Sequence, residues 1–298
     1  MAEHHSNLIP LQQLTQESGA SLQFVGVEQE DYNLDYASLE NILANEGNKV
    51  KAIVLSAVSN VLGYKLDLCR VIELRNKYCE EAILAIDAAQ LVGHEPFFPK
   101  DLGLDFVYFS AHKALGPMGI GVLWGRKEHL EKMSPIQFGG GMISRVQADR
   151  SDWNAVPARF EAGTPNVAGA VALAAALDYL LNIGLSNIKQ YLSELTDYLY
   201  ENLANRDDIL IHCPNNSQTR GALLSFSHRK LHPHDLAQAL DEYKVAVRAG
   251  QHCTQILHEE VLRLPGTVRT SLHVYNSQAD INRLIQALDE SETIRALS

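Results

Sequence analysis

Short apolar runs and amphipathic stretches alternate along the first 125 residues. The apolar runs are four to six residues long and are bounded by polar residues, glycine or proline, as expected for strands that are buried on both faces. These runs predict strands at residues 22–27, 52–57, 82–86, 106–109 and 119–124.

Helical spacing of apolar residues fills the gaps between these runs. It predicts helices at residues 36–44, with Asp35 as the N-cap, and at 67–78. Strands that alternate with helices favour a mostly parallel sheet with right-handed crossovers, so the expected fold class is α/β.

The pattern changes after Met133. Residues 134–153 are rich in glycine and polar residues with little periodicity, and we interpret them as a functional or interface loop. Two helices follow, an Ala/Leu-rich one at 166–182 and a long amphipathic one at 186–205. The tail alternates again, with strands expected at 222–226, 245–247 and 268–274 and helices at 233–243 and 278–288. We therefore predict a large domain at residues 1–175 and a smaller C-terminal α+β domain at 176–298.

Charge and composition exclude some classes of binding partner and indicate a cellular location. A net charge of −11 argues against nucleic acid or an anionic membrane as the main partner. The longest apolar stretch, residues 167–177, is too short to cross a bilayer, and the first ten residues do not have the pattern of a signal peptide. Four scattered cysteines suit a reducing compartment and predict a cytoplasmic protein without a structural zinc site.

Two segments, AILAIDAAQLVGHE and DFVYFSAHKALGP, place polar residues directly after an apolar strand. In open parallel sheets the crevice beyond the carboxyl ends of the strands is where ligands bind. We therefore expect one shared cleft to receive the side chains of Asp87, Gln90, Ser110, His112 and Lys113.

Burial at a strand end would lower the pKa of the Lys113 amine and prepare it for covalent chemistry with a carbonyl group. A carboxylate such as Asp87 in the same setting needs a cationic partner, and a protonated pyridine nitrogen is one. The alternative is a structural ion pair between Asp87 and Lys113 beside a structural histidine. Spacing by itself leaves both interpretations open.

Motifs along the whole chain add a resemblance. IDAAQ, FSAHKALGPMGIGVLWG, RFEAGTPN, VAVRAGQHC and VRTSLHVYN follow one another, after EHHSNLIP and VSNVLG. In this order they resemble the motifs of the Suf-type (group II) cysteine desulfurases. These belong to the class V aminotransferase family of fold-type I enzymes that use pyridoxal 5′-phosphate (PLP).

The resemblance implies roles around the cofactor. Lys113 resembles the lysine that holds PLP covalently, and Asp87 resembles the partner of its pyridine nitrogen. Gln90 resembles the donor to the phenolic oxygen, and His4 resembles the residue that stacks on the ring and moves protons. The expected phosphate ligands are Ser110, His112 and, from the other subunit of a homodimer, Thr164.

Other residues resemble the groups that handle the substrate. Asn60 and Arg269 are similar to the residues that hold the carboxylate of L-cysteine, and an arginine fork suits a carboxylate. Cys253 resembles the nucleophile that takes up sulfur as a persulfide. Arg248 and His252 would give Cys253 a positive neighbourhood that favours the thiolate.

By this resemblance the protein converts L-cysteine to L-alanine. The persulfide on Cys253 would pass to a sulfur-acceptor protein of the Suf type for iron–sulfur cluster assembly. Three alternatives stay open: a selenocysteine lyase, a non-catalytic remnant that keeps only dimer and acceptor surfaces, and another class V enzyme such as an aminotransferase. The RAGQHC motif argues against the last, since transamination needs no thiol. Four histidines, His5, His94, His232 and His234, are expected to be structural or solvent-exposed.

Family members resemble this chain only from the EHH motif onward, so the glycine- and threonine-containing phosphate turn of the family has no counterpart here. Such a turn offers backbone N–H groups to a phosphate. We therefore expect weak PLP binding and exposed apolar surface. Equilibrium dialysis against PLP measures this, and tight stoichiometric binding would refute the expectation.

Overall fold

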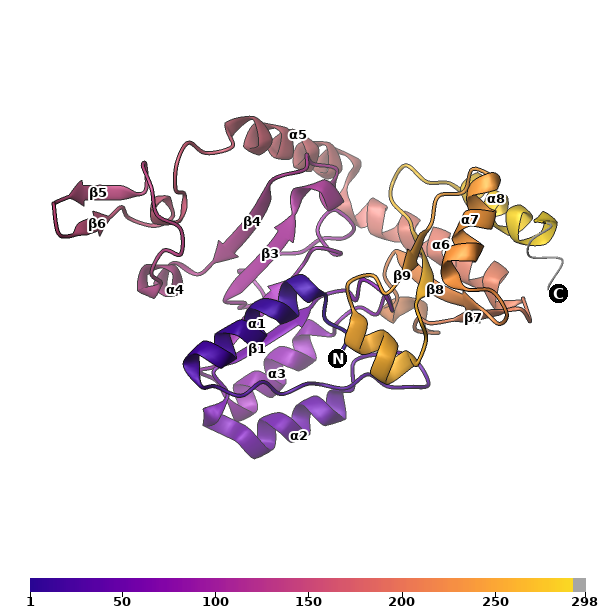
Figure 1. The fold of residues 1–298 in the computed structure, drawn as a ribbon, viewed down its shortest axis with the longest axis horizontal. Helices are drawn as coiled ribbons and strands as arrows, with labels where there is room; N and C mark the ends of the chain where they lie inside the picture. Colours follow the sequence, from indigo (N-terminus) through magenta and orange to yellow (C-terminus); the bar gives the residue numbers. More distant parts are fainter. Residues whose placement is uncertain (292–298) are drawn as a thin grey trace.

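Two four-stranded sheets, each with its own hydrophobic core, make up most of the fold (Figure 1). The computed structural model describes residues 1–291. In the first sheet the strands follow one another in the order β1 (Ala52–Ser56), β2 (Ile83–Asp87), β3 (Phe106–Ser110) and β4 (Gly121–Gly125).

The first three strands of this sheet are parallel, which confirms the α/β prediction, but β4 is antiparallel to β3. The connection from β3 to β4 runs only from Ala111 to Ile120. A parallel crossover needs a dozen residues or more, so this short link forces the chain to turn back. The register places Asp87 opposite both Ser56 on β1 and Tyr108 on β3.

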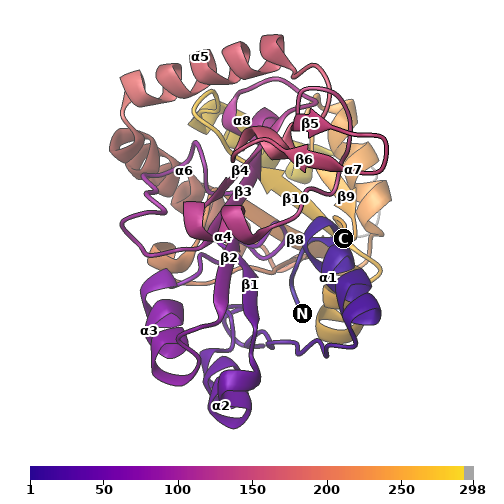
Figure 2. The same cartoon turned by 90° about the vertical axis from the view of Figure 1, so that its left-hand side faces the viewer.

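Helices cover both sides of the first sheet. Figure 2 shows α1 (His5–Ser18) on one side and α3 (Leu68–Tyr78) on the other, with α2 (Tyr36–Glu46) beside α3. As predicted, Asp35 caps α2, accepting the Ser38 N–H at 2.8 Å. The strand expected at 22–27 is wrong, because only Val27 makes a bridge there, to Leu34.

The middle segment is more regular than expected. After α4 (Lys127–Lys132), the residues that we interpreted as a loop contain a hairpin of β5 (Ile143–Val146) and β6 (Ser151–Trp153), which projects from one end of the molecule (Figure 1). Then come α5 (Val167–Ile183) and α6 (Leu185–Ala204). Within residues 1–291 no helix by itself has the length and apolar character to span a membrane, although α5 and α6, bent by 76°, pass that test as a pair.

The second sheet is antiparallel, in the order β7 (Ile209–Ile211), β8 (Leu223–His228), β10 (Thr267–Ser271) and β9 (Arg248–Gly250), and it packs with α7 (Pro233–Glu242) and α8 (Gln278–Glu290). The strand expected at 245–247 is wrong. The Val245 N–H bonds to Leu240 O and so belongs to the end of α7. Shorter turns complete the described chain: η1 (Gly47–Lys49), η2 (Ala111–Ala114), η3 (Ala158–Phe160), η4 (Ser217–Thr219) and the π-helix η5 (Leu257–Leu262).

The two cores draw on different parts of the chain. One combines residues from Ala2 to Val107 with Leu257, and the other runs from Ala114 to Leu288. The predicted division between residues 175 and 176 falls inside α5 and stays a prediction.

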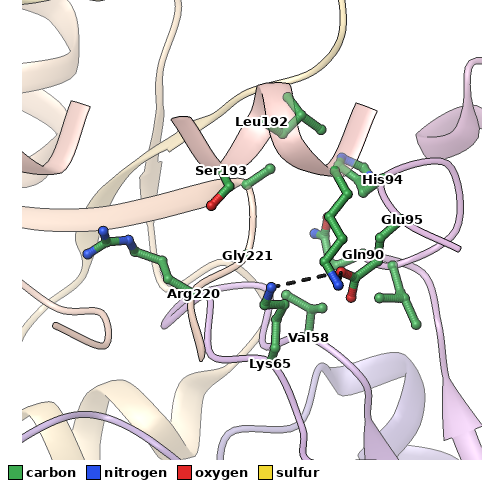
Figure 3. Close-up of a pocket in the computed structure, with 12 residues that line it drawn as sticks. Val58, Lys65, Gln90, His94, Glu95, Leu192, Ser193, Arg220 and Gly221 are labelled. Carbon is green, nitrogen blue, oxygen red and sulfur yellow. Dashed lines mark ion pairs between the residues drawn. The ribbon is translucent and has the colours of Figure 1, made fainter. Parts of the chain in front are cut away.

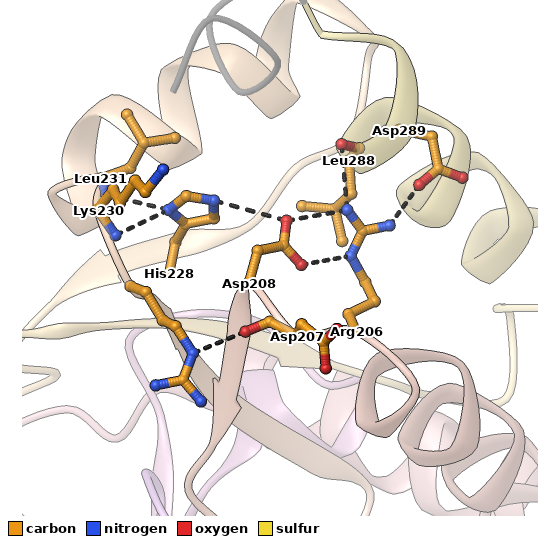
Figure 4. Close-up of polar contacts among 9 residues, drawn as sticks. Arg206, Asp207, Asp208, His228, Lys230, Leu231, Leu288 and Asp289 are labelled. Atoms are coloured by element: carbon orange, nitrogen blue, oxygen red, sulfur yellow. Dashed lines mark hydrogen bonds and ion pairs between the residues drawn. The ribbon is translucent and has the colours of Figure 1, made fainter. Parts of the chain in front are cut away.

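A network of charged groups ties the end of α6 to α8 (Figure 4). Arg206 donates from Nε and Nη2 to the two carboxylate oxygens of Asp208, at 3.1 and 3.0 Å, and from Nη1 to Asp289. The Arg206 side chain is only 16% exposed, so these contacts are partly shielded from water. A fork geometry of this kind is stronger than an isolated surface pair.

We predict that Arg206→Leu lowers the free energy of unfolding by about 1–3 kcal/mol, because it leaves the partly buried carboxylate of Asp208 without its donor. Lys49→Leu is the control, since the ion pair of Lys49 with Glu46 is 82% and 39% exposed, and removing such a pair costs less than about 1 kcal/mol. Urea denaturation followed by circular dichroism measures both, and equal losses in the two variants would contradict the prediction.

Candidate active site

A cavity of about 200 Å³ lies at the carboxyl ends of β1, β2 and β3. Six residues that the sequence pointed to line it together: His4, Asn60, Asp87, Gln90, Ser110 and Lys113. The remaining lining residues are Ser6, Ser56, Val58, Ala89, Tyr108 and Phe109. His4 and Lys113, which are more than one hundred positions apart in the sequence, thus lie at the same edge of the sheet.

Asp87 is the last residue of β2, and its Oδ1 accepts the Ala89 N–H at 2.8 Å. Burial raises the pKa of the Asp87 carboxyl, Glu3 adds to this, and Lys113 opposes it. Within residues 1–291 Asp87 has no ion-pair partner at 4.0 Å or less. The structural ion pair with Lys113, the alternative left open by the sequence, is therefore not formed.

Lys113 lies in η2, directly after β3, where a short turn brings its amine back to the cavity. Burial lowers the pKa of Lys113, the carboxyl of Asp87 opposes the shift, and the guanidinium groups of Arg269 and Arg248 add to it. A larger share of this amine is therefore uncharged in neutral solution than in an exposed lysine, which is the form that reacts with carbonyl carbon.

The first residues of the chain form one wall of the cavity. His4 caps α1, and its Nδ1 accepts the Ser6 N–H at 3.1 Å. Burial, followed by the positive charge of Lys113, lowers the pKa of His4. The ring is therefore neutral, and the contact at Nδ1 leaves the proton on Nε2.

Sequence reasoning missed the residues that fix this wall. Glu3 accepts the Ser56 N–H at 3.0 Å and the Ser56 hydroxyl at 2.6 Å, and it also accepts the Asn7 amide at 2.6 Å. Asn7 in turn accepts the hydroxyl of Tyr108. The contacts of Glu3 with Ser56 and of Asn7 with Tyr108 join segments about 50 to 100 positions apart, so no periodicity signals them. Glu3 is nevertheless the first residue of the EHH motif, and Asn7 follows two positions after it.

Arg269 and Asn60 connect the two cores at the cavity. Arg269, on β10, donates from Nη1 to the backbone oxygen of Asn60 at 2.9 Å. Its Nε is buried and has no partner among the described residues. Burial, together with Arg248, lowers the pKa of Arg269 to about 10, so the group remains charged in neutral solution.

Cys253 lies in the turn after β9, half-buried, and the Nη2 atom of Arg248 is 3.8 Å from its sulfur. His252 departs from the expectation of a positive neighbour. Its ring is 3% exposed and bonds through Nε2 to Thr267, and burial, followed by the charge of Arg269, lowers its pKa to about 3. His252 is thus neutral, and the positive charge near the thiol comes from Arg248.

Two of the expected phosphate ligands do not line the cavity. The His112 side chain is exposed on η2, because neighbouring residues of such a tight turn point in different directions. Thr164 is exposed in the segment before α5. Its expected role involves a second subunit, and this role stays a prediction.

A second, much smaller cleft adjoins the cavity and shares Val58 and Gln90 with it (Figure 3). The Glu95 carboxylate lies 3.8 Å from the amine of Lys65 and 3.0 Å from that of Lys189 on α6. These ion pairs hold the two cores together beside Gln90.

Comparison with known proteins places this geometry in a family. The model of the family described as Aminotransferase class-V matches residues 1–284. The probable cysteine desulfurase of Halalkalibacterium halodurans is 39% identical over 290 residues, which are 97% of this chain and 69% of that protein. The probable cysteine desulfurase of Staphylococcus epidermidis is also 39% identical, over 97% of this chain and 68% of its own length.

Solved structures give the same answer. The apo cysteine desulfurase from Thermococcus onnurineus NA1 superposes with a TM-score of 0.89 at 36% identity, over 97% of this chain and 70% of that one. The cysteine desulfurase CsdA from Escherichia coli, in an S-sulfonic acid form, superposes with a TM-score of 0.90 at 34% identity over the same shares. The predicted resemblance is confirmed, and this chain belongs to the aminotransferase class-V family, among the relatives of the cysteine desulfurases.

Proposed function

We propose that this chain is a PLP-dependent cysteine desulfurase that converts L-cysteine to L-alanine and keeps the sulfur as a persulfide on Cys253. The observation that carries the proposal is the cavity that the half-buried side chains of Asp87 and Lys113 line together without forming an ion pair. A thiol with an arginine beside it lies on the neighbouring turn.

The side chains of the cavity fit PLP. A buried carboxylate that lacks a cation is suited to a protonated pyridine nitrogen, so Asp87 would hold that end of the ring. Lys113 would hold the cofactor covalently, Gln90 would donate to its phenolic oxygen, His4 would stack on the ring, and Ser110 would donate to the phosphate. When bound, PLP withdraws electrons from the α-carbon of an amino acid and so makes its proton removable.

Arg269 and Asn60 would orient the substrate. The Nη1 atom of Arg269 already donates to the Asn60 carbonyl, while Nε is buried and has no partner within residues 1–291. A carboxylate that accepts from Nε and Nη2 would satisfy this donor through two parallel hydrogen bonds. The fixed fork would then direct the amino group and the sulfur of cysteine toward opposite walls of the cavity.

Lys113 and His4 would move protons. The lowered pKa of Lys113 supplies a neutral Nζ that can accept the proton of the substrate α-carbon and return it. His4 is neutral and carries its proton on Nε2, so it can donate that proton and recover it from solvent. Two proton carriers allow one proton to leave the α-carbon while another arrives at the β-carbon.

Cys253 would take the sulfur. Its sulfur forms the new S–S bond to the substrate sulfur while the bond from that sulfur to the β-carbon breaks. The electron pair of the broken C–S bond stays with the β-carbon, which receives a proton and gives alanine. The substrate sulfur is oxidised to the persulfide level in the same step, so no other oxidant or reductant is needed. The Nη2 atom of Arg248 lies 3.8 Å from the Cys253 sulfur and places a positive charge beside the attacking atom.

The remaining features concern partners and location. We propose a homodimer in which Thr164 reaches the PLP phosphate of the other subunit, with His112 close to the same group. The persulfide would pass to a small sulfur-acceptor protein of the Suf type for iron–sulfur cluster assembly. The four free cysteines suit the reducing cytoplasm, which we propose as the location of this protein.

We also propose that the chain is divided into two domains, at residues 1–175 and 176–298.

We predict that the protein, incubated with PLP and L-cysteine, releases alanine and, with a reductant present, an equal amount of sulfide. Cys253→Ala should abolish both products, because no thiol remains to accept the sulfur, while the buried Cys213→Ala should retain them. Mass spectrometry of the unreduced protein should locate one added sulfur on the Cys253 peptide. Undiminished sulfide release by Cys253→Ala would disprove the role of this thiol.

We also predict that Asp87→Asn lowers kcat by about a hundredfold or more, since an amide does not keep a pyridine nitrogen protonated. The affinity for PLP should change less than kcat, because the other contacts to the cofactor are retained. Asp149→Asn, a substitution of an exposed residue, serves as the control. Steady-state alanine formation measures the effect, and a kcat of Asp87→Asn equal to that of the control would contradict the assignment.

A further inference from the structure

The turn that carries Cys253 has an unusual backbone. His252 and Cys253 have φ values of 52° and 60°, so two successive residues with side chains occupy the left-handed region. Such conformations persist only where surrounding contacts hold them in place. The contacts that hold this turn therefore decide where the thiol lies.

Two of these contacts come from His5. The His5 N–H donates to the backbone oxygen of Cys253 at 2.8 Å. The ring Nε2 of His5 accepts the N–H of Gln255 at 3.1 Å. His5 thus holds the turn on both sides of Cys253, with its backbone N–H as a donor and its ring Nε2 as an acceptor.

These two hydrogen bonds provide acceptors for the first N–H groups of two helical segments. His5 is the first residue of α1, and Gln255 begins the helical turn that leads into η5. The first N–H groups of a helix have no acceptor within it. Here each of the two segments supplies an acceptor for the other, so neither can shift without leaving an N–H unpaired.

Hydrogen bonds also fix the start of α1, the helix that begins with His5. Glu3 and Asn7 hold the start of α1 to Ser56, the last residue of β1, and to Tyr108 in the middle of β3. The turn is also held from the opposite side, where the Asn60 amide donates to the backbone oxygen of His252 at 2.8 Å. The sheet edge that bears the cavity therefore also sets the position of the Cys253 turn.

We propose that His5 is a positioning residue for Cys253, which keeps the thiol beside Arg248 through its ring Nε2 and its backbone N–H. This proposal rests on the proposed function for the reaction that the thiol performs. His5 itself is not among the residues that line the cavity. The sequence predicted only a structural or exposed histidine at this position.

The test uses three substitutions of His5 in the full chain. Leu removes the ring acceptor, Asn keeps a polar group that is too short to reach the position of Nε2, and Gln places an amide oxygen near that position. Gln13→Leu, on the exposed face of the same helix, is the control for adding leucine to α1. All four variants keep the backbone N–H of residue 5, so only the ring contact changes.

Hydrogen exchange of the Gln255 amide, measured in the protein without PLP, reports the contact directly. We expect exchange about tenfold faster in His5→Leu and His5→Asn, the effect of losing one hydrogen bond, and within about threefold of the parent in His5→Gln and Gln13→Leu. With PLP and cysteine, kcat should fall about tenfold in the first two variants at a nearly unchanged KM, and His5→Gln should recover it.

Either of two results would overturn the proposal. One is unchanged protection of the Gln255 amide in both His5→Leu and His5→Asn. The other is faster exchange with no loss of kcat, which would make the contact merely structural. If His5→Leu does not fold, the comparison of His5→Asn with His5→Gln decides. A parent that releases no alanine from cysteine would refute the proposed function, and the exchange measurement would still decide whether His5 holds the turn.

Discussion

Two parallel strands that end side by side impose the constraint on which this protein depends. The register of β2 against β3 puts Asp87 opposite Tyr108, and the turn after β3 returns the Lys113 amine to the same edge. Both groups lose water there, which raises the pKa of the acid and lowers that of the amine. The two groups do not form an ion pair with each other. The Asp87 carboxylate can therefore bind a cationic group of a ligand, and the Lys113 amine can react with a carbonyl carbon.

The rest of the architecture serves this edge. The first residues of the chain fold back over it through Glu3, which joins β1 to α1. The second core contributes Arg269 and the turn of Cys253 from its own sheet. A substrate between them would contact groups from both cores, so a change in how the cores meet would alter the site even if no lining residue changed.

Much of this was predictable from local sequence, and the failures have physical causes. Asp35 predicted the start of α2, and the apolar runs after it predicted strands, because helix capping and strand burial depend on neighbouring residues in the sequence. The direction of β4 follows from the length of its connection, which periodicity does not encode. The neutral state of His252 and the contacts of His5 depend on burial and on partners far away in the chain. The order of the family motifs was enough to predict which residues share the site. Their protonation states could not be predicted from the sequence, because they depend on burial in the folded protein.

The central claim is that the amine of Lys113, opposite Asp87, is the group that holds PLP. Borohydride reduction of the protein incubated with PLP, followed by peptide mass spectrometry, measures this most directly. The account predicts a pyridoxyl phosphate label on the peptide that contains Lys113 and little on other lysines. A label spread over surface lysines, or its absence from Lys113, would contradict it.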